Sequence, residues 1–194
     1  MRCLVCESLS FSIICKNCQE DLLKSNFYKR EIDKDFFVYS FYTYGEIKEL
    51  LNCKYEFYGD RVLNILAKLS FEKFASNFDF TNQIYAIPID DFVKKDFSHS
   101  AILVHHLKSK YITPIYNTLH AKHRVKYAGK SLEFRKQNIR DFRYSGEKNI
   151  QAILVDDIVT TGLTMKEAKK VLEENGCEVL FALTLSDLGA NITH

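Results

Sequence analysis

Hydrophobic and polar residues follow two different periods along the chain. Short apolar runs rich in aromatic and β-branched residues indicate buried β-strands, which we expect at 36–44, 83–89, 152–155 and 178–185. Apolar residues three and four positions apart indicate amphipathic helices, which we expect from residue 47 onward and at 60–74, 98–107 and 165–174. Strands that alternate with helices predict an α/β fold with a mainly parallel sheet covered on both faces.

The chain divides into a short N-terminal segment and a longer remainder. Residues 21–35 are polar and charged, and their few apolar positions suit a short helix and a linker. We therefore predict a small module with its linker at 1–35 and one larger domain at 36–194.

The composition excludes several classes of protein. The 194 residues include 15 Phe and 11 Tyr but only 7 Gly and 2 Pro, which excludes a disordered or collagen-like chain. The first residues lack the apolar stretch of a secretory signal, and the longest apolar runs fall far short of the roughly 20 residues that span a bilayer. We expect a cytoplasmic protein, and any membrane association would be peripheral.

Four of the six cysteines form two closely spaced pairs, Cys3-x-x-Cys6 and Cys15-x-x-Cys18. Two such pairs can deliver four thiolates to one tetrahedral Zn²⁺, and clustered cysteines in a reducing compartment are more often metal ligands than disulfides. A closed shell of four sulfurs leaves no position for water, so we predict a structural zinc site. The alternative is four unrelated core thiols, but so short a segment has no core of its own to bury them.

The most informative segment is 152–164, which reads AILVDDIVTTGLT. It is an apolar strand that ends in two acids, Asp156 and Asp157, followed by a loop and the start of a helix. Gly162 permits close backbone approach to a ligand, and N–H groups at a helix N-terminus favour a phosphate. The segment also carries three hydroxyl donors, Thr160, Thr161 and Thr164.

Paired carboxylates beside a phosphate cradle predict a ribose 5-phosphate ligand. Asp156 and Asp157 would not bind the phosphate, because like charges repel, but they can accept hydrogen bonds from vicinal ribose hydroxyls or hold Mg²⁺. The alternative is that a threonine caps the helix and nothing binds, although capping alone requires neither two acids nor three threonines. Walker A and dinucleotide-binding loops do not fit, since the required lysine and glycines are absent here.

This segment resembles the phosphoribosyl-pyrophosphate (PRPP) motif of type I phosphoribosyltransferases, and with the Cys-rich start the whole chain resembles the ComF competence family. Further matches extend over nearly the full length: 44–51 with Lys54, the strand end Ile87-Pro88-Ile89, and Arg135-x-x-Asn138 followed by Phe142.

The resemblance implies a PRPP site at the motif residues Asp156, Asp157, Thr160, Thr161, Gly162 and Thr164. If an acceptor displaces pyrophosphate from ribose C1, it implies that the two acids are the catalytic groups and that Mg²⁺ is bound with PRPP. It also implies a role in natural transformation, in which single-stranded DNA enters the cytoplasm beside a helicase-like motor at the inner membrane.

Basic residues are concentrated in one tract. The whole chain has a net charge of +2, but residues 108–148 contain 11 Lys and Arg against 3 acids, so this tract is +8 and the remainder is −6. Interleaved Tyr and Phe suit the stacked bases and phosphates of single-stranded nucleic acid. The alternative is that the cations bind the pyrophosphate of PRPP. For either use we expect contacts from Arg124, Lys126, Lys130 and Arg135.

Three functions stay open on the sequence alone. The first is a DNA-uptake factor that binds PRPP and single-stranded DNA, with or without transferase activity, and we favour it. The second is a nucleotide-salvage phosphoribosyltransferase, which would need a hood that recognises the base, and only nine residues follow Leu185. The third is a PRPP-sensing regulator without catalysis.

Overall fold

The computed structural model describes residues 1–89, 97–123, 133 and 140–190. Its helices are α1 (Lys16–Asp21), α2 (Tyr44–Asn52), α3 (Gly59–Ala67), α4 (Lys73–Asn77), α5 (His99–His105) and α7 (Leu163–Glu174), with a 3₁₀ turn η1 (Cys53–Tyr55) and a π-helical segment η2 (Lys68–Glu72). Its strands are β1 (Tyr28–Asp33), β2 (Phe36–Thr43), β3 (Ile84–Pro88), β4 (Ile112–Pro114), β5 (Leu119–Ala121), β6 (Phe142–Tyr144), β7 (Gln151–Val159) and β8 (Glu178–Asp187).

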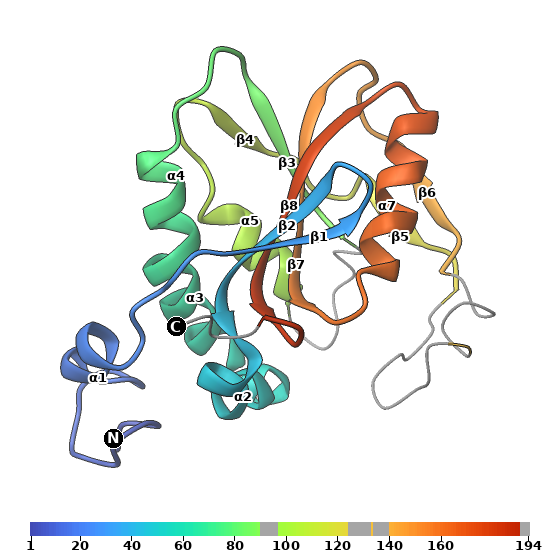
Figure 1. Ribbon diagram of the computed structural model, residues 1–194. Helices are drawn as coiled ribbons and strands as arrows, with labels where there is room; N and C mark the ends of the chain where they lie inside the picture. The colour runs from blue at the N-terminus through green and yellow to red at the C-terminus, as the bar shows by residue number, and fades with distance from the viewer. Residues whose placement is uncertain (90–96, 124–132, 134–139, 191–194) are drawn as a thin grey trace.

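Six strands form the main sheet, in the order β1-β2-β8-β7-β3-β4. The pairs from β2 to β4 are all parallel, and only β1 joins its neighbour antiparallel. Figure 1 shows α7 on one face of this sheet and the group α3 to α5 on the other. The predicted α/β class with a mainly parallel sheet covered on both faces is therefore confirmed.

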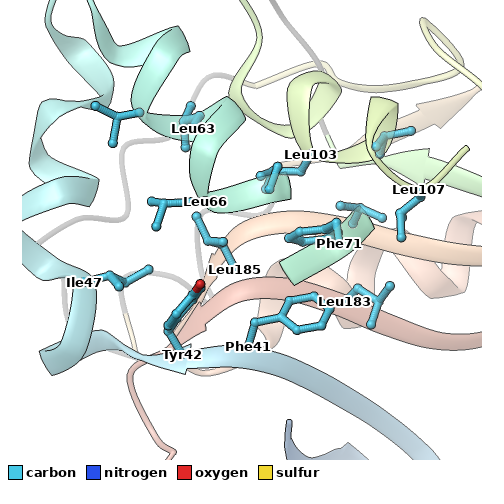
Figure 2. Packing of buried hydrophobic residues seen from close by; sticks show 14 of the residues in the cluster. Phe41, Tyr42, Ile47, Leu63, Leu66, Phe71, Leu103, Leu107, Leu183 and Leu185 are labelled. Atoms are coloured by element: carbon cyan, nitrogen blue, oxygen red, sulfur yellow. The ribbon is translucent and has the colours of Figure 1, made fainter. Parts of the chain in front are cut away.

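Two apolar layers hold the helices against the sheet. The larger layer lies under α2, α3 and α5 and includes Phe41, Leu66, Phe71, Leu103 and Leu183, all 3% exposed or less (Figure 2). The smaller layer lies under α7 and includes Val38, Leu154, Met165, Leu172 and Ala182. Strand β7 supplies residues to both layers, which explains why its sequence is continuously apolar instead of alternating.

Strand β1 contradicts our prediction of a helix and linker at 21–35. Residues Tyr28–Asp33 form an edge strand that pairs with β2, from Tyr28 opposite Ser40 to Asp33 opposite Phe36. Only Ile32 of this strand is buried, so the segment lacks the apolar run by which we identified the other strands. The hairpin crosses the boundary placed at residue 35, and the division of the chain into 1–35 and 36–194 stays a prediction.

Several elements are longer than we predicted, among them the helix expected at 60–74 and strand β7. The helix expected at 60–74 is a continuous helical run from Gly59 to Asn77, in which η2 separates α3 from α4. Strand β7 continues to Val159, so Asp156 and Asp157 lie within the strand and not after it. This extension remains paired with β8, from Asp156 opposite Thr184 to Val159 opposite Asp187. None of the described helices is both long enough and apolar enough to cross a membrane.

Candidate functional site

The predicted phosphate loop lies where the direction of the strand connections reverses. From β3 the chain crosses through α5 to β4 on one side, whereas from β7 it crosses through α7 to β8 on the other. Ligands of open α/β sheets bind at the carboxyl ends of the strands beside such a switch point. The two strands are joined there by a hydrogen bond from the N–H of Ile89 to the carbonyl of Val155, at 2.8 Å.

The loop between β7 and α7 is shaped for a close backbone approach. Gly162 has a φ of +77°, and a Cβ built on it would lie 3.0 Å from the Cβ of Ile32, so a side chain here would be both strained and crowded. Helix α7 begins directly after it and has no acid in its first turn. Asp156 and residues 158–165 line a small hollow at this point. The first N–H groups of α7 and its positive dipole end are therefore available to an anion.

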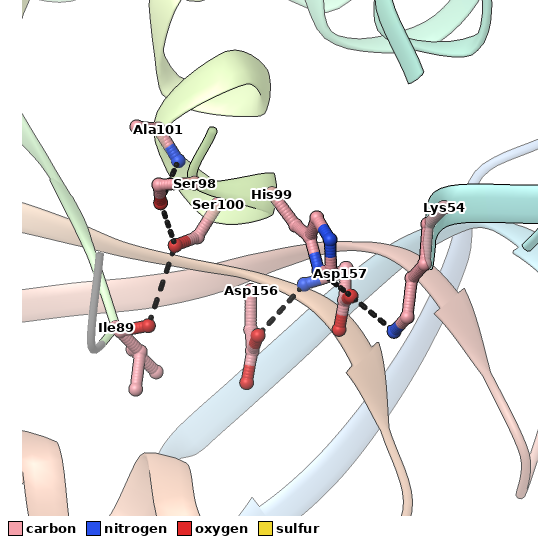
Figure 3. A network of polar contacts seen from close by, with 8 residues as sticks. All are labelled: Lys54, Ile89, Ser98, His99, Ser100, Ala101, Asp156 and Asp157. Carbon is pink, nitrogen blue, oxygen red and sulfur yellow. Dashed lines mark hydrogen bonds and ion pairs between the residues drawn. The ribbon is translucent and has the colours of Figure 1, made fainter. Parts of the chain in front are cut away.

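Asp157 does not line this hollow and is held on the other side of the strand. The Nζ of Lys54 donates to its Oδ2 at 2.5 Å, and the Nδ1 of His99 lies 3.6 Å from the same oxygen (Figure 3). Burial by itself would raise the pKa of Asp157, but the charge of Lys54, with the nearby imidazole of His99, outweighs it and holds that pKa well below its usual value. Asp157 is therefore a fixed anion.

His99 owes its position to the start of α5. The Oγ of Ser98 accepts from the N–H of Ala101 at 3.2 Å and caps the helix, and the Oγ of Ser100 donates to the carbonyl of Ile89 at 3.4 Å (Figure 3). These bonds tie the first turn of α5 to the end of β3. The imidazole of His99 is thereby directed at Asp157.

Asp156 has the opposite electrostatic situation. Burial and the neighbouring charge of Asp157 raise the pKa of Asp156 to about 7, although Arg140 and the N–H of Asp157, which donates to its Oδ1 at 2.8 Å, lower it in part. Two adjacent carboxyl groups thus differ in charge state at neutral pH. Asp156 is the one on the side of the hollow, where an ionised carboxylate can accept hydrogen bonds from hydroxyls or bind a divalent cation.

The structure brings most of the predicted site residues together. Around the hollow lie Asp156, Thr160, Thr161, Gly162 and Thr164, whereas Asp157 faces Lys54. The four predicted cationic contacts, Arg124, Lys126, Lys130 and Arg135, lie outside the described residues. Arg140, from the same basic tract, favours the ionised form of Asp156 through its positive charge and so lowers the pKa of that group.

Our sequence reasoning did not select Lys54, His99 or Arg140 as site residues. Lys54 was noted in a family-like segment, and that was its one signal. His99 gave no signal, because the cap on Ser98 that orients it depends on the backbone geometry. Lys54 and His99 reach Asp157 from positions far away in the chain.

The four N-terminal cysteines form a compact cluster. Their sulfurs all lie within 4.8 Å of one another, and the Sγ atoms of Cys6 and Cys15 are 3.7 Å apart. A tetrahedral zinc site with Zn–S bonds of about 2.3 Å would have S–S edges of about 3.8 Å. The Sγ of Cys3 also accepts N–H groups from Val5 and Cys15, as a thiolate ligand would. The donor set and its spacing fit a structural zinc ion.

Comparisons with known proteins find structural likeness alone. No family model and no curated protein matches the sequence. Similar solved structures include a hypoxanthine phosphoribosyltransferase from Staphylococcus aureus (14% identity, TM-score 0.40), for which the match covers 66% of this chain and 64% of that chain. An adenine phosphoribosyltransferase from Trypanosoma brucei, solved with AMP, pyrophosphate and ribose-5-phosphate, has 13% identity and a TM-score of 0.40 over 87% of this chain and 93% of that chain. At this level of likeness we draw no argument about function from either.

Proposed function

We propose that this chain binds a ribose 5-phosphate group, as found in PRPP, together with Mg²⁺, in the hollow between β7 and α7. The observation that carries the proposal is the meeting of three features in one place: an acid that titrates near neutrality, a loop with a required glycine, and the N-terminus of a 12-residue helix. The N–H groups and the threonine hydroxyls receive the 5-phosphate. The carboxylate of Asp156 receives the ribose hydroxyls.

Mg²⁺ fits the same donor set. This ion prefers oxygen ligands and is usually held by one or two carboxylates together with substrate phosphates. Asp156 supplies such a carboxylate, and Asp157, one residue away, adds negative charge that Lys54 largely compensates. When bound, the ion would neutralise the pyrophosphate group of PRPP and polarise its bond to ribose C1.

Calorimetric titration with PRPP, with and without Mg²⁺, tests the proposal. We expect binding that requires Mg²⁺ and that falls by about 100-fold or more in an Asp156→Ala, Asp157→Ala double variant, since several charge-assisted contacts are lost. Asp79→Asn, which removes an exposed acid after α4, is the matched control and should bind normally. Unchanged affinity in the double variant would refute the site.

We further place this site in a DNA-uptake protein, in which PRPP binding accompanies binding of single-stranded DNA beside a helicase-like motor, peripherally at the inner membrane. This step is supported by the charge of +8 on residues 108–148 and by the resemblance described for the sequence. Fluorescence anisotropy with a single-stranded oligonucleotide should report binding that weakens steeply with salt, as phosphate contacts require. Salt-independent or absent binding would remove DNA from the proposal.

Two alternatives share the PRPP site and differ in what accompanies it. A nucleotide-salvage phosphoribosyltransferase would release pyrophosphate from PRPP when a free nucleobase is added. A PRPP-sensing regulator would bind PRPP without DNA binding or turnover. Pyrophosphate release and oligonucleotide binding, measured on the same preparation, therefore separate the three functions.

A further inference from the structure

Strand β1, at the edge of the main sheet, contacts the proposed phosphate loop through the side chain of Arg30. The guanidinium of Arg30 donates from Nε to Oδ2 of Asp187 at 2.7 Å and from Nη2 to Oδ1 at 2.8 Å. The same Nη2 donates to the carbonyl oxygen of Thr160 at 2.9 Å. One side chain thus connects β1, the end of β8 and the first residue of the loop.

Asp187, which holds the guanidinium of Arg30, is buried, and both of its carboxylate oxygens accept hydrogen bonds. The side chain of Asp187 is 1% exposed, and its Oδ1 also accepts the N–H of Gly189 at 2.7 Å. A bidentate arginine–carboxylate pair has a fixed planar geometry, so the position of Asp187 determines where the third donated hydrogen bond of Arg30 can go. Arg30 itself is 29% exposed, so it lies beside the loop at the protein surface.

The bond to Thr160 determines which way the following N–H group points. In a trans peptide unit the C=O and the next N–H lie in one plane and point in opposite directions. Because Arg30 draws the carbonyl of Thr160 toward β1, the N–H of Thr161 is directed away from β1. Thr160 and Thr161 both line the hollow.

A second contact from β1 supports the same loop. The side chain of Ile32, two residues after Arg30 on the strand, lies against Gly162, and a Cβ added there would be 3.0 Å from the Cβ of Ile32, closer than ordinary van der Waals contact. The carbonyl of Val159, just before the loop, accepts the N–H of Leu188 at 3.0 Å. The backbone from 159 to 162 is therefore braced by residues outside the segment that binds phosphate.

We propose that Arg30 is a positioning residue for the phosphate site, which fixes the peptide between Thr160 and Thr161 so that its N–H group faces the 5-phosphate. The proposal rests on the function proposed above. Arg30 does not contact the ligand; it acts through the loop. Asp187 acts one step further away, because it orients Arg30.

Replacement of Arg30 by lysine tests this role, because lysine keeps the charge but cannot make the bidentate pair and the bond to Thr160 together. In Arg30→Lys we expect calorimetry to show about tenfold weaker binding of ribose 5-phosphate, as for the loss of oriented backbone hydrogen bonds. In ¹H–¹⁵N spectra, the amide proton of Thr161 should shift strongly on ribose 5-phosphate addition in the original protein and weakly in the variant. A purely structural role for Arg30 would leave that amide response intact.

Matched variants make the outcomes distinct. Lys29→Met removes a positive charge from the neighbouring, exposed position of β1 and should leave ribose 5-phosphate binding unchanged. Asp187→Asn removes the anchor but keeps Arg30, should weaken binding in the same direction, and decides the question if Arg30→Lys does not fold. Should the original protein fail to bind ribose 5-phosphate, the proposed function is wrong. Binding by the original protein together with equal binding by Arg30→Lys, or equal weakening by Lys29→Met, would overturn the positioning role alone.

Discussion

Lys54 and Asp157, 103 positions apart in the chain, form an ion pair of 2.5 Å in the interior of the protein. The side chains of both residues are at least 85% buried. Burial by itself would lower the pKa of Lys54, but the charge of Asp157 raises it, so both groups stay ionised. The pair joins η1, which follows α2, to the strand that carries the candidate site.

Loss of Lys54 should destabilise the fold and should do so less at low pH. In Lys54→Met, Asp157 is left as a buried carboxylate without its main partner, which typically costs about 3–5 kcal/mol. At pH 4 the cost should be smaller, because an unpaired Asp157 can take up a proton. Urea denaturation at pH 7 and pH 4 measures both values. Lys48→Met, at an exposed position of α2, is the control, and equal losses in the two variants would contradict the role of the pair.

Asp156 should make the protein less stable as the pH rises. Its pKa is about 7 in the folded protein and about 3.9 in an unfolded chain, so the folded state binds the extra proton between these values. The stability from this group is present below about pH 4 and is lost as the pH rises to about 7. Asp156→Asn removes the cost of ionising this buried group. At pH 8 its free energy of unfolding should therefore be about 2–4 kcal/mol higher than that of the original protein.

The same variant should lose ligand binding while it gains stability. Thermal unfolding in Mg²⁺-free buffer should show a higher midpoint for Asp156→Asn at pH 8 and a similar midpoint to the original protein at pH 4. Mg²⁺-dependent PRPP binding should be strongly weakened in Asp156→Asn, and in the original protein it should strengthen from pH 6 to pH 8 as Asp156 ionises. A stability difference that does not change with pH would mean that Asp156 is not protonated in the folded state.

The sequence predicts the core of the fold well because its buried strands are apolar on both faces. Runs such as 152–155 and 178–185 can hardly be anything other than interior strands, and they were found. Strand β1 was missed because an edge strand needs to bury only one residue, Ile32, and its lysine, arginine and glutamate resemble those of a linker. The predicted end of β7 was also too early, because Asp156 and Asp157 suggested that the strand had finished before them.

The residues of the candidate site also fall into two groups, those that could be selected from the sequence and those that could not. Residues that act through their own backbone and neighbours, such as Gly162 and Thr164, form one local motif and could be selected from sequence. Residues that act by reaching across the fold could not, because nothing near Lys54 or Arg30 in the sequence indicates which acid each will meet. The partners become neighbours only through the order of the strands and the position of η1.

The four-cysteine cluster should contain one zinc ion per chain. Its sulfurs lie within 4.8 Å of one another, a spacing that suits four thiolates on one tetrahedral ion. Cys6→Ser should lower the metal content and the melting temperature, because an exposed ligand is lost without any change in the core. Cys53→Ser, outside the cluster, should change neither. Metal analysis of protein purified without chelator decides the point, and a content far below one zinc per chain would refute the site.

Gly162 and Gly45 occupy opposite environments in the fold. Gly162 has a φ of +77° and lies against Ile32, whereas Gly45 lies in helix α2 with nothing within 4 Å of a built Cβ. Gly45→Ala should therefore stabilise the protein by about 0.5–1 kcal/mol, as alanine does in an exposed helix. Gly162→Ala should cost about 1–2 kcal/mol through backbone strain.

The two substitutions should differ even more in ligand binding. Since the methyl group added by Gly162→Ala would have to displace either Ile32 or the loop, the N–H groups after β7 would move, and we expect ribose 5-phosphate affinity to fall by about tenfold or more, as for misplaced donors. Gly45→Ala adds the same methyl group far from the loop and should leave the affinity unchanged. Calorimetry and urea denaturation on both variants measure the two effects side by side. If Gly162→Ala bound ribose 5-phosphate as tightly as Gly45→Ala, the loop would not be the phosphate cradle, whatever its effect on stability.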